Sequence, residues 1–337
     1  MSKVLCFGEL LLRLSPSAEG DWLQKNSVPA FVGGAEANVA TALALWGQPS
    51  AYCTALPDNF LSRQLAVYLQ QKNIDTSAIH YSGERVGLYY LQQGTDMKHS
   101  GVVFDRAGSS FAQLKKGMIN WDAAFEGISW FHFSAIAASL SLSAAEVCEE
   151  ALQAAQKKGI TVSVDLNYRE KLWKYGKQPN EIMPGLVQYC DLVMGNVWAA
   201  NKMLGITLND KWIVQNAKEA YLEQALQTST EIQQRFAKVK TVANTFRFDD
   251  NGGIKYYTAL FKEKLFVSSE YAATTVTDKV GSGDCFMGGL IYGFCKGHSP
   301  QQVLDFATAA AFNKLFIKGD TTDQSVYTIE ATIKKNG

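Results

Sequence analysis

A glycine-rich stretch late in the chain holds the residue types best suited to chemistry. It precedes a small, apolar segment typical of a buried helix and has the sequence Thr277-Asp278-Lys279-Val280-Gly281-Ser282-Gly283-Asp284-Cys285-Phe286. A glycine-rich turn entering a helix gathers several backbone N–H groups at the positive end of the helix dipole. Because Gly281 and Gly283 have no side chain, the backbone there can approach a ligand closely. The stretch therefore predicts a cradle for a phosphate or another oxyanion.

Asp284 stands beside this cradle, where the predicted helix begins. Its carboxylate can accept a proton from an incoming hydroxyl while the amides of Gly281, Ser282 and Gly283 stabilise charge on a transferred phosphoryl group. The alternative is a tight turn in which Asp284 only caps the helix. The stretch lacks the Gly-Lys-Ser/Thr of a Walker loop and the third spaced glycine of a dinucleotide fingerprint, which argues against a hydride-transfer enzyme.

A second glycine pair, Gly33-Gly34, precedes another predicted helix, and Asn38 lies one turn inside it. Paired glycines leave space for a ligand against the backbone, and an Asn on the first turn can donate and accept hydrogen bonds with sugar hydroxyls. A plain loop followed by a solvated Asn is the alternative. We therefore predict that Gly33, Gly34 and Asn38 bind a sugar.

The elements that must position these residues alternate between short apolar runs and helical patterns. This alternation predicts an α/β fold in which a mostly parallel sheet is covered by helices on both faces. Strands are expected at 3–9, 160–166, 191–195 and 239–245. Helices are expected at 35–46, from the pair Ser143 and Glu146 to Gly159, at about 209–238, and from Ser299-Pro300 to about 317.

Two segments, about 10–32 and 83–110, break this rhythm with short alternating strands and polar turns. They predict a small sheet that stands off the main body. We find no internal repeat and no Pro/Gly-rich linker, so we expect one domain over residues 1–337 with these two segments inserted in it.

Composition limits the class of partner. Lys plus Arg and Asp plus Glu number 32 each, so no net field favours a nucleic acid or an anionic membrane. The six cysteines show no metal-ligand spacing, and no apolar run is long enough to span a bilayer. We expect a cytoplasmic protein that acts on a small molecule.

The two glycine-rich segments together resemble the ribokinase-like (PfkB-type) sugar kinases. In that family an early Gly-Gly…Asn segment helps to hold the sugar, and a late Asp-Thr-x-Gly-Ala-Gly-Asp segment supplies the anion hole and the base. The matching residues here are Gly33, Gly34 and Asn38, then Asp278, Gly281, Gly283 and Asp284, with Lys279 and Ser282 replacing the usual Thr and Ala. The resemblance implies a three-layer α/β/α sandwich with a β-sheet lid, and a kinase that uses ATP.

Two arginines bear on the acceptor. Arg106 lies in the second inserted segment, and Arg169 follows the predicted strand at 160–166. If both face the cleft, two permanent positive charges favour an anionic sugar, because a carboxylate accepts a bidentate pair from Arg. The alternative for each arginine is an ordinary surface salt bridge.

The same residues resemble 2-keto-3-deoxygluconate kinases in particular. That resemblance implies sugar contacts from Tyr89 or Tyr90, Arg106, Asn167 and Arg169. It rests on Gly8-Glu9, Gly33 to Asn38, Arg106 to Ser109, Asp165 to Arg169 and Leu172-Trp173, whereas Phe104 and Asp105 depart from the usual tyrosines. The implied reaction gives the 6-phosphate of the sugar acid. Fructose or another neutral ketose is the second candidate acceptor, and a sugar-acid sensor without turnover is the candidate from another class.

On the nucleotide side, the resemblance assigns Asn196, Thr245, Arg247, Asp278 and Asn313 to ATP. Ala199 stands where family members often have a Glu that organises Mg²⁺ through water. Mg²⁺ is therefore expected to be held by the ATP phosphates and water, without a direct protein ligand. A monovalent cation such as K⁺ is a further candidate cofactor. Exposed lid strands suggest a homodimer or higher homo-oligomer that forms through the lid.

Overall fold

The computed structural model describes residues 3–94, 101–209, 217–250 and 253–336. Residues 95–100 of the predicted small-sheet segment and 210–216 of the predicted polar helix lie outside the described residues. In the part that is described, no helix is long and apolar enough to cross a membrane.

The strands and helices alternate along most of the chain. The strands are β1 (Lys3–Phe7), β2 (Leu11–Leu14), β3 (Ala30–Gly33), β4 (Ser50–Leu56), β5 (Ile74–Asp75), β6 (Ile79–Tyr81), β7 (Gly87–Leu91), β8 (Val102–Asp105), β9 (Ile128–Ser134), β10 (Thr161–Asp165), β11 (Leu192–Met194), β12 (Thr241–Asp250), β13 (Gly253–Lys262), β14 (Lys264–Val267) and β15 (Tyr271–Ala273). The helices are α1 (Asp21–Gln24), α2 (Ala35–Leu45), α3 (Phe60–Gln70), α4 (Trp121–Ala124), α5 (Ala135–Ser139), α6 (Leu142–Lys157), the 3-10 helix η1 (Glu170–Leu172), α7 (Pro179–Val187), α8 (Val197–Leu204), α10 (Lys218–Arg235), α11 (Ser282–Cys295), α12 (Pro300–Lys314) and α13 (Val326–Asn336).

The main sheet has the strand order β14-β13-β12-β11-β10-β9-β1-β4-β5, with β15 beside β13 and β6 beside β4. Its pairs are parallel from β12 through β1 to β5 and antiparallel from β12 to β14. The central strands are buried over most of their length, and β4 over all of it, because helices cover both faces. The sequence prediction of a mostly parallel sheet is confirmed.

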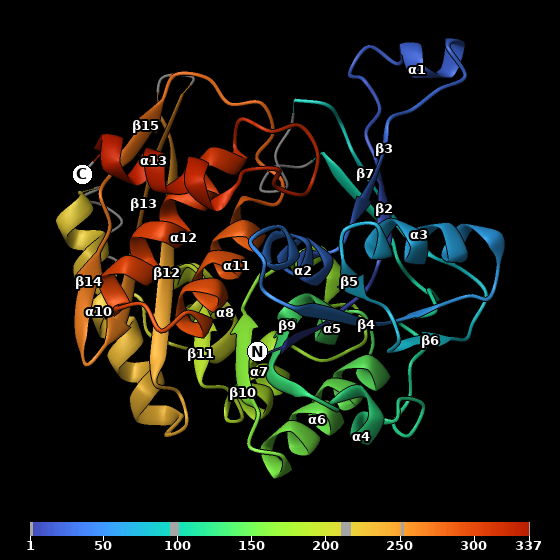
Figure 1. Ribbon diagram of the computed structural model, residues 1–337, viewed down its shortest axis with the longest axis horizontal. Helices are drawn as coiled ribbons and strands as arrows, with labels where there is room; N and C mark the ends of the chain where they lie inside the picture. The colour runs from blue at the N-terminus through green and yellow to red at the C-terminus, as the bar shows by residue number, and fades with distance from the viewer. Residues whose placement is uncertain (1–2, 95–100, 210–216, 251–252, 337) are drawn as a thin grey trace.

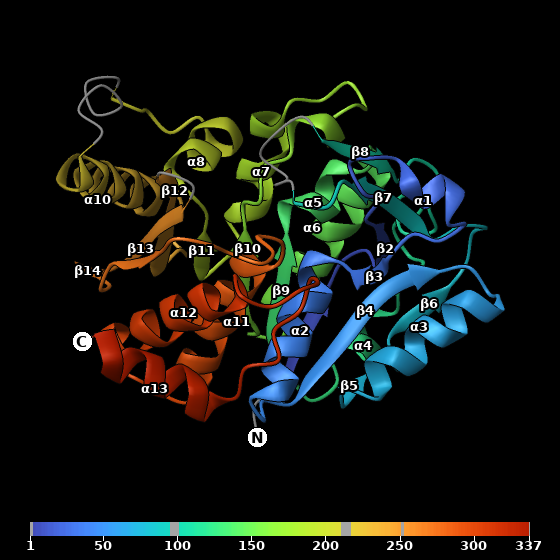
Figure 2. The same ribbon diagram turned by 90° about the horizontal axis from the view of Figure 1, so that it is seen from above.

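Helices form a layer on each side of this sheet (Figures 1 and 2). One layer contains α2, α11, α12 and α13, and the other contains α5, α6, α7, α8 and α10. Helix α11 packs closely on α12 because Gly289 faces the backbone of Ala307, where a side chain would not fit. This close packing helps to fix the position of α11, whose first turn lies in the glycine-rich stretch.

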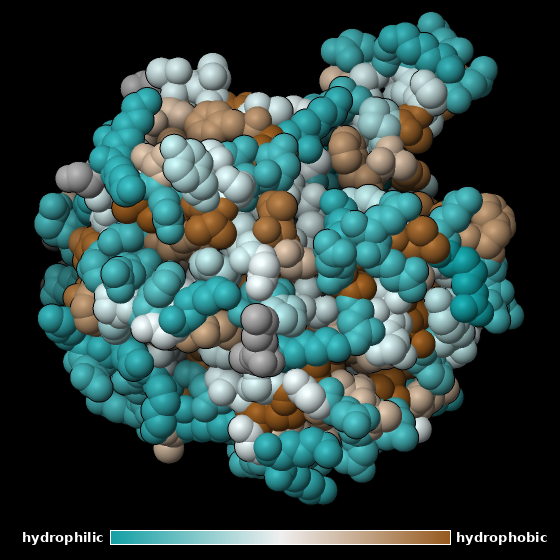
Figure 3. Space-filling view, in the orientation of Figure 1, coloured by the Kyte–Doolittle hydropathy of each residue, from teal (hydrophilic) through white to brown (hydrophobic). Residues whose placement is uncertain are grey.

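A separate four-stranded sheet, in the order β3-β2-β7-β8, stands off the main body. Its strands come from the two segments predicted to form a small sheet. The arm that carries α1 extends from it and is mostly hydrophilic on the face seen in Figure 3. One face of the small sheet packs on the main body, where Leu11, Tyr89 and Leu91 cluster with Val280 of the glycine-rich stretch.

Several predicted boundaries were wrong by a few residues. Helix α6 is capped by Ser141, whose Oγ accepts a hydrogen bond from the Ala144 amide at 3.0 Å, so Ser143 lies within the first turn and is not the cap. The first strand ends at Phe7, not at residue 9. Helix α12 ends at Lys314 rather than near 317. In contrast, α2 ends as expected, with Gly47 in the left-handed conformation after its last turn.

Candidate active site

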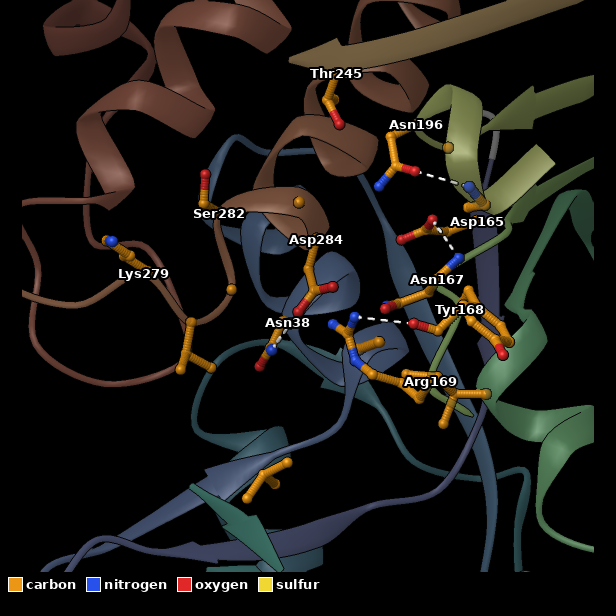
Figure 4. A pocket seen from close by; sticks show the side chains of 18 of the residues that line it. Asn38, Asp165, Asn167, Tyr168, Arg169, Asn196, Thr245, Lys279, Ser282 and Asp284 are labelled. Carbon is orange, nitrogen blue, oxygen red and sulfur yellow. Dashed lines mark hydrogen bonds between the residues drawn. The ribbon is translucent and has the colours of Figure 1, made fainter. Parts of the chain in front are cut away.

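A pocket of about 670 Å³ lies between the carboxyl ends of the parallel strands, the small sheet and the start of α11. Figure 4 shows its side chains, with Asp284 in the middle of the group. Ligands of open parallel sheets bind outside the carboxyl ends of the strands, so the position is the expected one for this architecture. The pocket walls contain residues from both glycine-rich segments.

Helix α11 begins at the pocket wall without a side-chain cap. Gly281 is the N-cap residue, with φ of 79°, and the hydroxyl of Ser282 instead donates to the Ala311 carbonyl at 3.0 Å. Asp284 lies inside the first turn, so it is not the helix cap considered as an alternative above. The backbone from Gly281 to Gly283 lines the pocket, and helix-start amides carry partial positive charge. The arrangement can hold an anion.

Glycine is required at position 281 for two reasons. Its positive φ is costly for a residue with a side chain, and a Cβ atom there would clash with the carbonyl oxygen of Asp320. The loop after α12 therefore supports the turn from behind. This contact fixes the position of the amides that line the pocket.

Asp284 is 9% exposed, and its Oδ2 accepts a hydrogen bond from the Asn38 side-chain amide at 2.6 Å. Burial raises the pKa of Asp284 to about 7, and nearby Asp165 and Glu36 act in the same direction, whereas the hydrogen bond from Asn38 lowers it. A carboxylate with a pKa near 7 is matched to proton transfer at neutral pH. The structure thus joins the two glycine-rich segments at this carboxylate.

The other end of the Asn38 amide is left unsatisfied. Its Oδ1 atom is buried and has no hydrogen-bond partner among the described residues. A buried acceptor without a donor is costly, and a ligand hydroxyl is one group that can supply the missing hydrogen bond. Asn38 lines the pocket, as predicted for a sugar-binding residue.

Arg169 lies in the pocket wall and has no acidic partner among the residues that the structure describes. Its Nη1 donates to the Tyr168 carbonyl at 3.2 Å, and no carboxylate of the described residues lies within salt-bridge distance. Burial lowers the pKa of Arg169, whereas Asp165 and Asp284 oppose that shift. Guanidinium nevertheless stays charged in proteins. The wall opposite the start of α11 therefore presents a cation that can bind an anionic ligand (Figure 4).

Arg106 also lines the pocket, but its charge is already compensated. Its Nε donates to Glu9, which also accepts a hydrogen bond from Ser109, and both the arginine and the glutamate are buried. Both arginines therefore line the pocket, which was the condition of the charge argument, but Glu9 compensates the charge of Arg106. The argument that positive charge in the pocket favours an anionic sugar therefore depends on Arg169 alone.

The small sheet is tied to the glycine-rich stretch by a buried charge network. Arg13 is 3% exposed; its Nε donates to Asp320 at 2.7 Å and its Nη2 to Asp278 at 2.9 Å. Tyr89 donates to the other Asp320 oxygen at 3.0 Å. Burial disfavours the charge of Arg13, yet its pKa is raised because Asp320 and Asp278 stabilise the cation. This network fixes Tyr89 in the pocket wall.

The predicted nucleotide residues Asn196, Thr245 and Arg247 line the far part of the pocket. Asn196 caps α8, because its Oδ1 accepts from the Ala199 amide at 2.8 Å. Arg247 donates to the Lys279 carbonyl at 3.4 Å, which connects β12 with the glycine-rich stretch. Asn167, which was predicted to contact the sugar, also lines the pocket, and its backbone N–H donates to Oδ1 of Asp165 at 3.0 Å.

Four predicted site residues do not line the pocket: Gly33, Tyr90, Asp278 and Asn313. Tyr90 lies on the opposite face of β7 from Tyr89, because side chains alternate along a strand. Asp278 uses its carboxylate to bind Arg13 and the amides of Val280 and Gly319. Asn313 exchanges hydrogen bonds with Thr332 of α13, and Gly33 faces Asp320 rather than the pocket.

Sequence reasoning also missed residues. Asp165 and Asp320 line the pocket, and burial raises the pKa of Asp165 to about 6. Tyr256 lines it too, with a buried hydroxyl that has no partner among the described residues. The sequence did contain a signal for Arg13, because it is the single charged residue of the otherwise apolar strand β2 and so suggests a buried ion pair. Asp320 and Tyr256 gave none, because only the fold brings them to the site.

Comparison with known proteins places the whole chain among carbohydrate kinases. Residues 1–324 match the model of the pfkB family carbohydrate kinases. The structure of 2-dehydro-3-deoxygluconokinase from Thermotoga maritima superposes with a TM-score of 0.88 at 35% identity, covering 99% of this chain and 98% of that one. The 2-dehydro-3-deoxygalactonokinase of Haloferax volcanii is 27% identical over 95% of this chain and 92% of its own length. Fructokinase-1 of Oryza sativa subsp. japonica is 26% identical over 86% and 81%.

Proposed function

The chain belongs to the pfkB family of carbohydrate kinases, and we propose that it transfers the γ-phosphoryl group of ATP to a sugar acid. The proposed acceptor is 2-keto-3-deoxygluconate, also called 2-dehydro-3-deoxygluconate, and the product is its 6-phosphate. The observation that carries this choice is Arg169, a pocket cation without a carboxylate partner among the described residues. The names of the Thermotoga and Haloferax relatives support the same substrate class.

The charge argument favours an acid over a neutral sugar. A buried cation that lacks an anion is destabilising, whereas a substrate carboxylate can accept two parallel hydrogen bonds from one guanidinium. Bound to Arg169, the substrate carboxylate would lie in the part of the pocket lined by Asn167 and Arg169. A terminal hydroxyl of the same sugar would then point toward Asp284.

In the proposed mechanism, Asp284 accepts the proton of that hydroxyl as the oxygen attacks the γ-phosphorus. Asn38 orients the Asp284 carboxylate through its amide group, and its unpaired Oδ1 is available to a sugar hydroxyl. The amides from Gly281 to Gly283 stabilise the oxygens of the migrating phosphoryl group. Because such transition states are loose, positioning and charge stabilisation contribute most of the rate.

The nucleotide would occupy the part of the pocket lined by Asn196, Thr245 and Arg247. Mg²⁺ would be held by the ATP phosphates and water, and Asn196 and the buried carboxylate of Asp165, which line this wall, offer oxygen acceptors to that water. No cluster of three or more potential metal ligands occurs among the described residues. When bound to ATP, Mg²⁺ neutralises phosphate charge. The residues of this chain would then hold the phosphates through backbone amides and Arg247.

A panel of acceptors tests the proposal. ADP release would be measured with Mg²⁺-ATP and 2-keto-3-deoxygluconate, 2-keto-3-deoxygalactonate, fructose or another neutral ketose. We expect the highest kcat/KM for a sugar acid. A preference for fructose would overturn the Arg169 argument, and ligand binding without ADP release would indicate a sensor.

The variant Arg169→Met tests directly whether Arg169 binds the carboxylate of the substrate. Hydrogen bonds to charged groups contribute about 1.5–3 kcal/mol, so the KM for the sugar acid should rise about 10- to 100-fold. The KM for a neutral ketose should change little. Arg85→Met is the matched control, because Arg85 pairs with Asp105 on the small sheet and does not line the pocket. Equal effects of Arg169→Met on acidic and neutral acceptors would contradict the assignment.

One observation favours the second candidate, fructose or another neutral ketose. The charge of Arg106 is compensated by Glu9, so of these two arginines only Arg169 lacks a carboxylate partner among the described residues. A neutral ketose meets a lower desolvation cost at one cation than at two. The acceptor panel above decides between the two classes.

We further propose that the protein works in the cytoplasm as a homodimer or higher oligomer formed through the small sheet. Its six cysteines are all free, as expected in a reducing compartment. Strands β3 and β8 form the edges of the small sheet, and Val103 of β8 is 60% exposed. Val103→Lys should lower the molar mass measured by light scattering, and an unchanged oligomer would exclude β8 as the contact.

A further inference from the structure

Lys314, the last residue of α12, has an unusual environment for a lysine. Its side chain is 0% exposed, and its Nζ donates to the Ile317 carbonyl at 3.0 Å. An ammonium group has three donors, and no carboxylate of the described residues lies within 4.0 Å of this one. Burial lowers the pKa of Lys314, whereas Asp278 favours the cation. Such a burial is costly and calls for a physical explanation.

The side chain runs behind the anion cradle and does not line the pocket. A Cβ atom placed on Gly281 would lie 3.4 Å from Cε of Lys314. The ammonium is thus close to the positive end of α11, where a second positive charge is unfavourable in the absence of an anion. Its position is favourable only when negative charge lies nearby.

The surrounding charges show what Lys314 balances. Arg13, Asp278 and Asp320 form the buried network beside the cradle, and together they carry a net charge of about −1 when both carboxylates are ionised. Lys314 interacts electrostatically with all three of these residues. With Lys314 the group is neutral. Without it, an uncompensated negative charge would lie directly behind the amides that are to hold a phosphoryl group.

We propose that Lys314 is a built-in cation of the anion cradle, a positioning residue that acts through the turn at Gly281. It neutralises the carboxylates behind the turn, and so keeps the cradle attractive to the negative charge of the phosphoryl group. A covalently held ammonium supplies this positive charge permanently, so no bound monovalent metal ion is needed to supply it. Phosphoryl transfer by this protein is therefore independent of added K⁺. The inference rests on the proposed kinase reaction but on no particular acceptor.

The first test uses the unmodified protein. Its kcat with the best acceptor of the panel would be measured in buffers whose only monovalent cation is K⁺, Na⁺ or tetramethylammonium. The proposal predicts values within about twofold of one another. A strong requirement for K⁺ would overturn it, because an internal cation would then not suffice.

The second test removes the charge. Lys314→Met keeps the length and apolar stem of the side chain, and we expect kcat to fall about 10- to 100-fold, less than when a direct oxyanion donor is lost. The KM of the sugar should change little, because Lys314 does not line the pocket. Lys238→Met is the matched control, since Lys238 also donates to a backbone carbonyl, that of Tyr189, but far from the pocket.

Chemical rescue separates an electrostatic role from a folding defect. In Lys314→Met, added ammonium or K⁺ should restore part of the lost kcat, whereas tetramethylammonium, which is too large for the site, should not. Full activity of the variant without any cation would overturn the proposal. Loss of kcat that no cation restores, in a variant with an unchanged melting temperature, would also overturn it. Failure of the proposed sugar-acid function would appear separately, as a different acceptor preference of the unmodified protein.

Discussion

Helices α2 and α11 both begin at a glycine-rich segment, and the two starts differ in what surrounds them. At α2, protein atoms fill the space, because Gly34 faces the Glu9 carbonyl and Glu36 of the first turn accepts hydrogen bonds from the amide and hydroxyl of Ser134. At α11, the backbone from Gly281 to Gly283 lines the pocket and carries no side-chain cap. We call the α2 start closed, because protein atoms contact its glycine and its first turn although Gly34 and Ala35 also line the pocket, and we call the α11 start open, because its backbone is available to a ligand.

The comparison shows that glycines before a helix can serve close packing as well as a ligand site. In α2, Gly34 allows the helix to pack against the Glu9 carbonyl and Gly33 faces Asp320, while Gly34, Ala35 and Asn38 all line the pocket. In α11 the glycines themselves form the wall. The two helices meet at the hydrogen bond between Asn38 and Asp284, so one start orients the residue that the other presents.

The largest expected effect is on catalysis at the open start. Asp284→Asn removes the base but keeps the shape of the side chain, and loss of a positioned base typically costs about 10²–10⁴-fold in rate. Steady-state kinetics should show this loss in kcat, while calorimetry shows sugar binding retained. A variant that kept most of its kcat would show that another group accepts the proton.

The closed start should respond in stability instead. Glu36→Ala leaves the buried amide and hydroxyl of Ser134 without an acceptor, which should lower the free energy of unfolding by about 2–3 kcal/mol. Urea unfolding measures this change, and kcat should stay within about threefold at a temperature where the variant is folded. A large kcat loss with unchanged stability would mean that α2 takes a direct part in the chemistry.

Gly281→Ala tests whether the geometry of the open start matters. The new methyl group would clash with the Asp320 carbonyl, so the turn must move, and displacements of about 1 Å in an active site can cost about 10²-fold in rate. We expect kcat to fall by about 10- to 100-fold. Gly297→Ala is the control, because Gly297 has a similar φ of 72° but no atom near its added Cβ. It should lose stability only.

The pH dependence of kcat/KM provides a further test. Burial raises the pKa of Asp284 to about 7, so the base is protonated and inactive below that pH, and activity should rise between pH 6 and pH 8. Folding stability should depend on pH in the opposite direction to activity. The native state binds this proton more tightly than the unfolded chain, so the contribution of Asp284 to stability is present below about pH 4 and lost as pH rises through 7. Asp284→Asn should therefore raise the melting temperature more at pH 8 than at pH 5.

The smallest effect is expected for a residue that the sequence assigned to ATP and the structure places elsewhere. Asn313 exchanges hydrogen bonds with Thr332 and does not line the pocket. Asn313→Ala should leave the KM for ATP within about twofold and lower stability slightly. A tenfold increase in that KM would show that α12 contacts the nucleotide after all.

The sequence alone was sufficient for the features that depend on local patterns. Alternating apolar runs and helical periods predicted the parallel sheet and its two helical layers, because burial on both faces imposes them over many residues. Gly281 and Asp284 were identifiable because a positive φ and a helix start are local properties. The small sheet was also predictable from the strand pattern of its two segments.

Only the tertiary structure decided which charges are free. Arg106 and Arg169 look alike in the sequence, yet Glu9 pairs with Arg106 and no described carboxylate pairs with Arg169. Asp320 and Lys314 reach the back of the anion cradle from the far end of the chain, and strand alternation turns Tyr89 toward the pocket but Tyr90 away from it. Charge compensation depends on distances between residues remote in sequence, which local patterns do not encode.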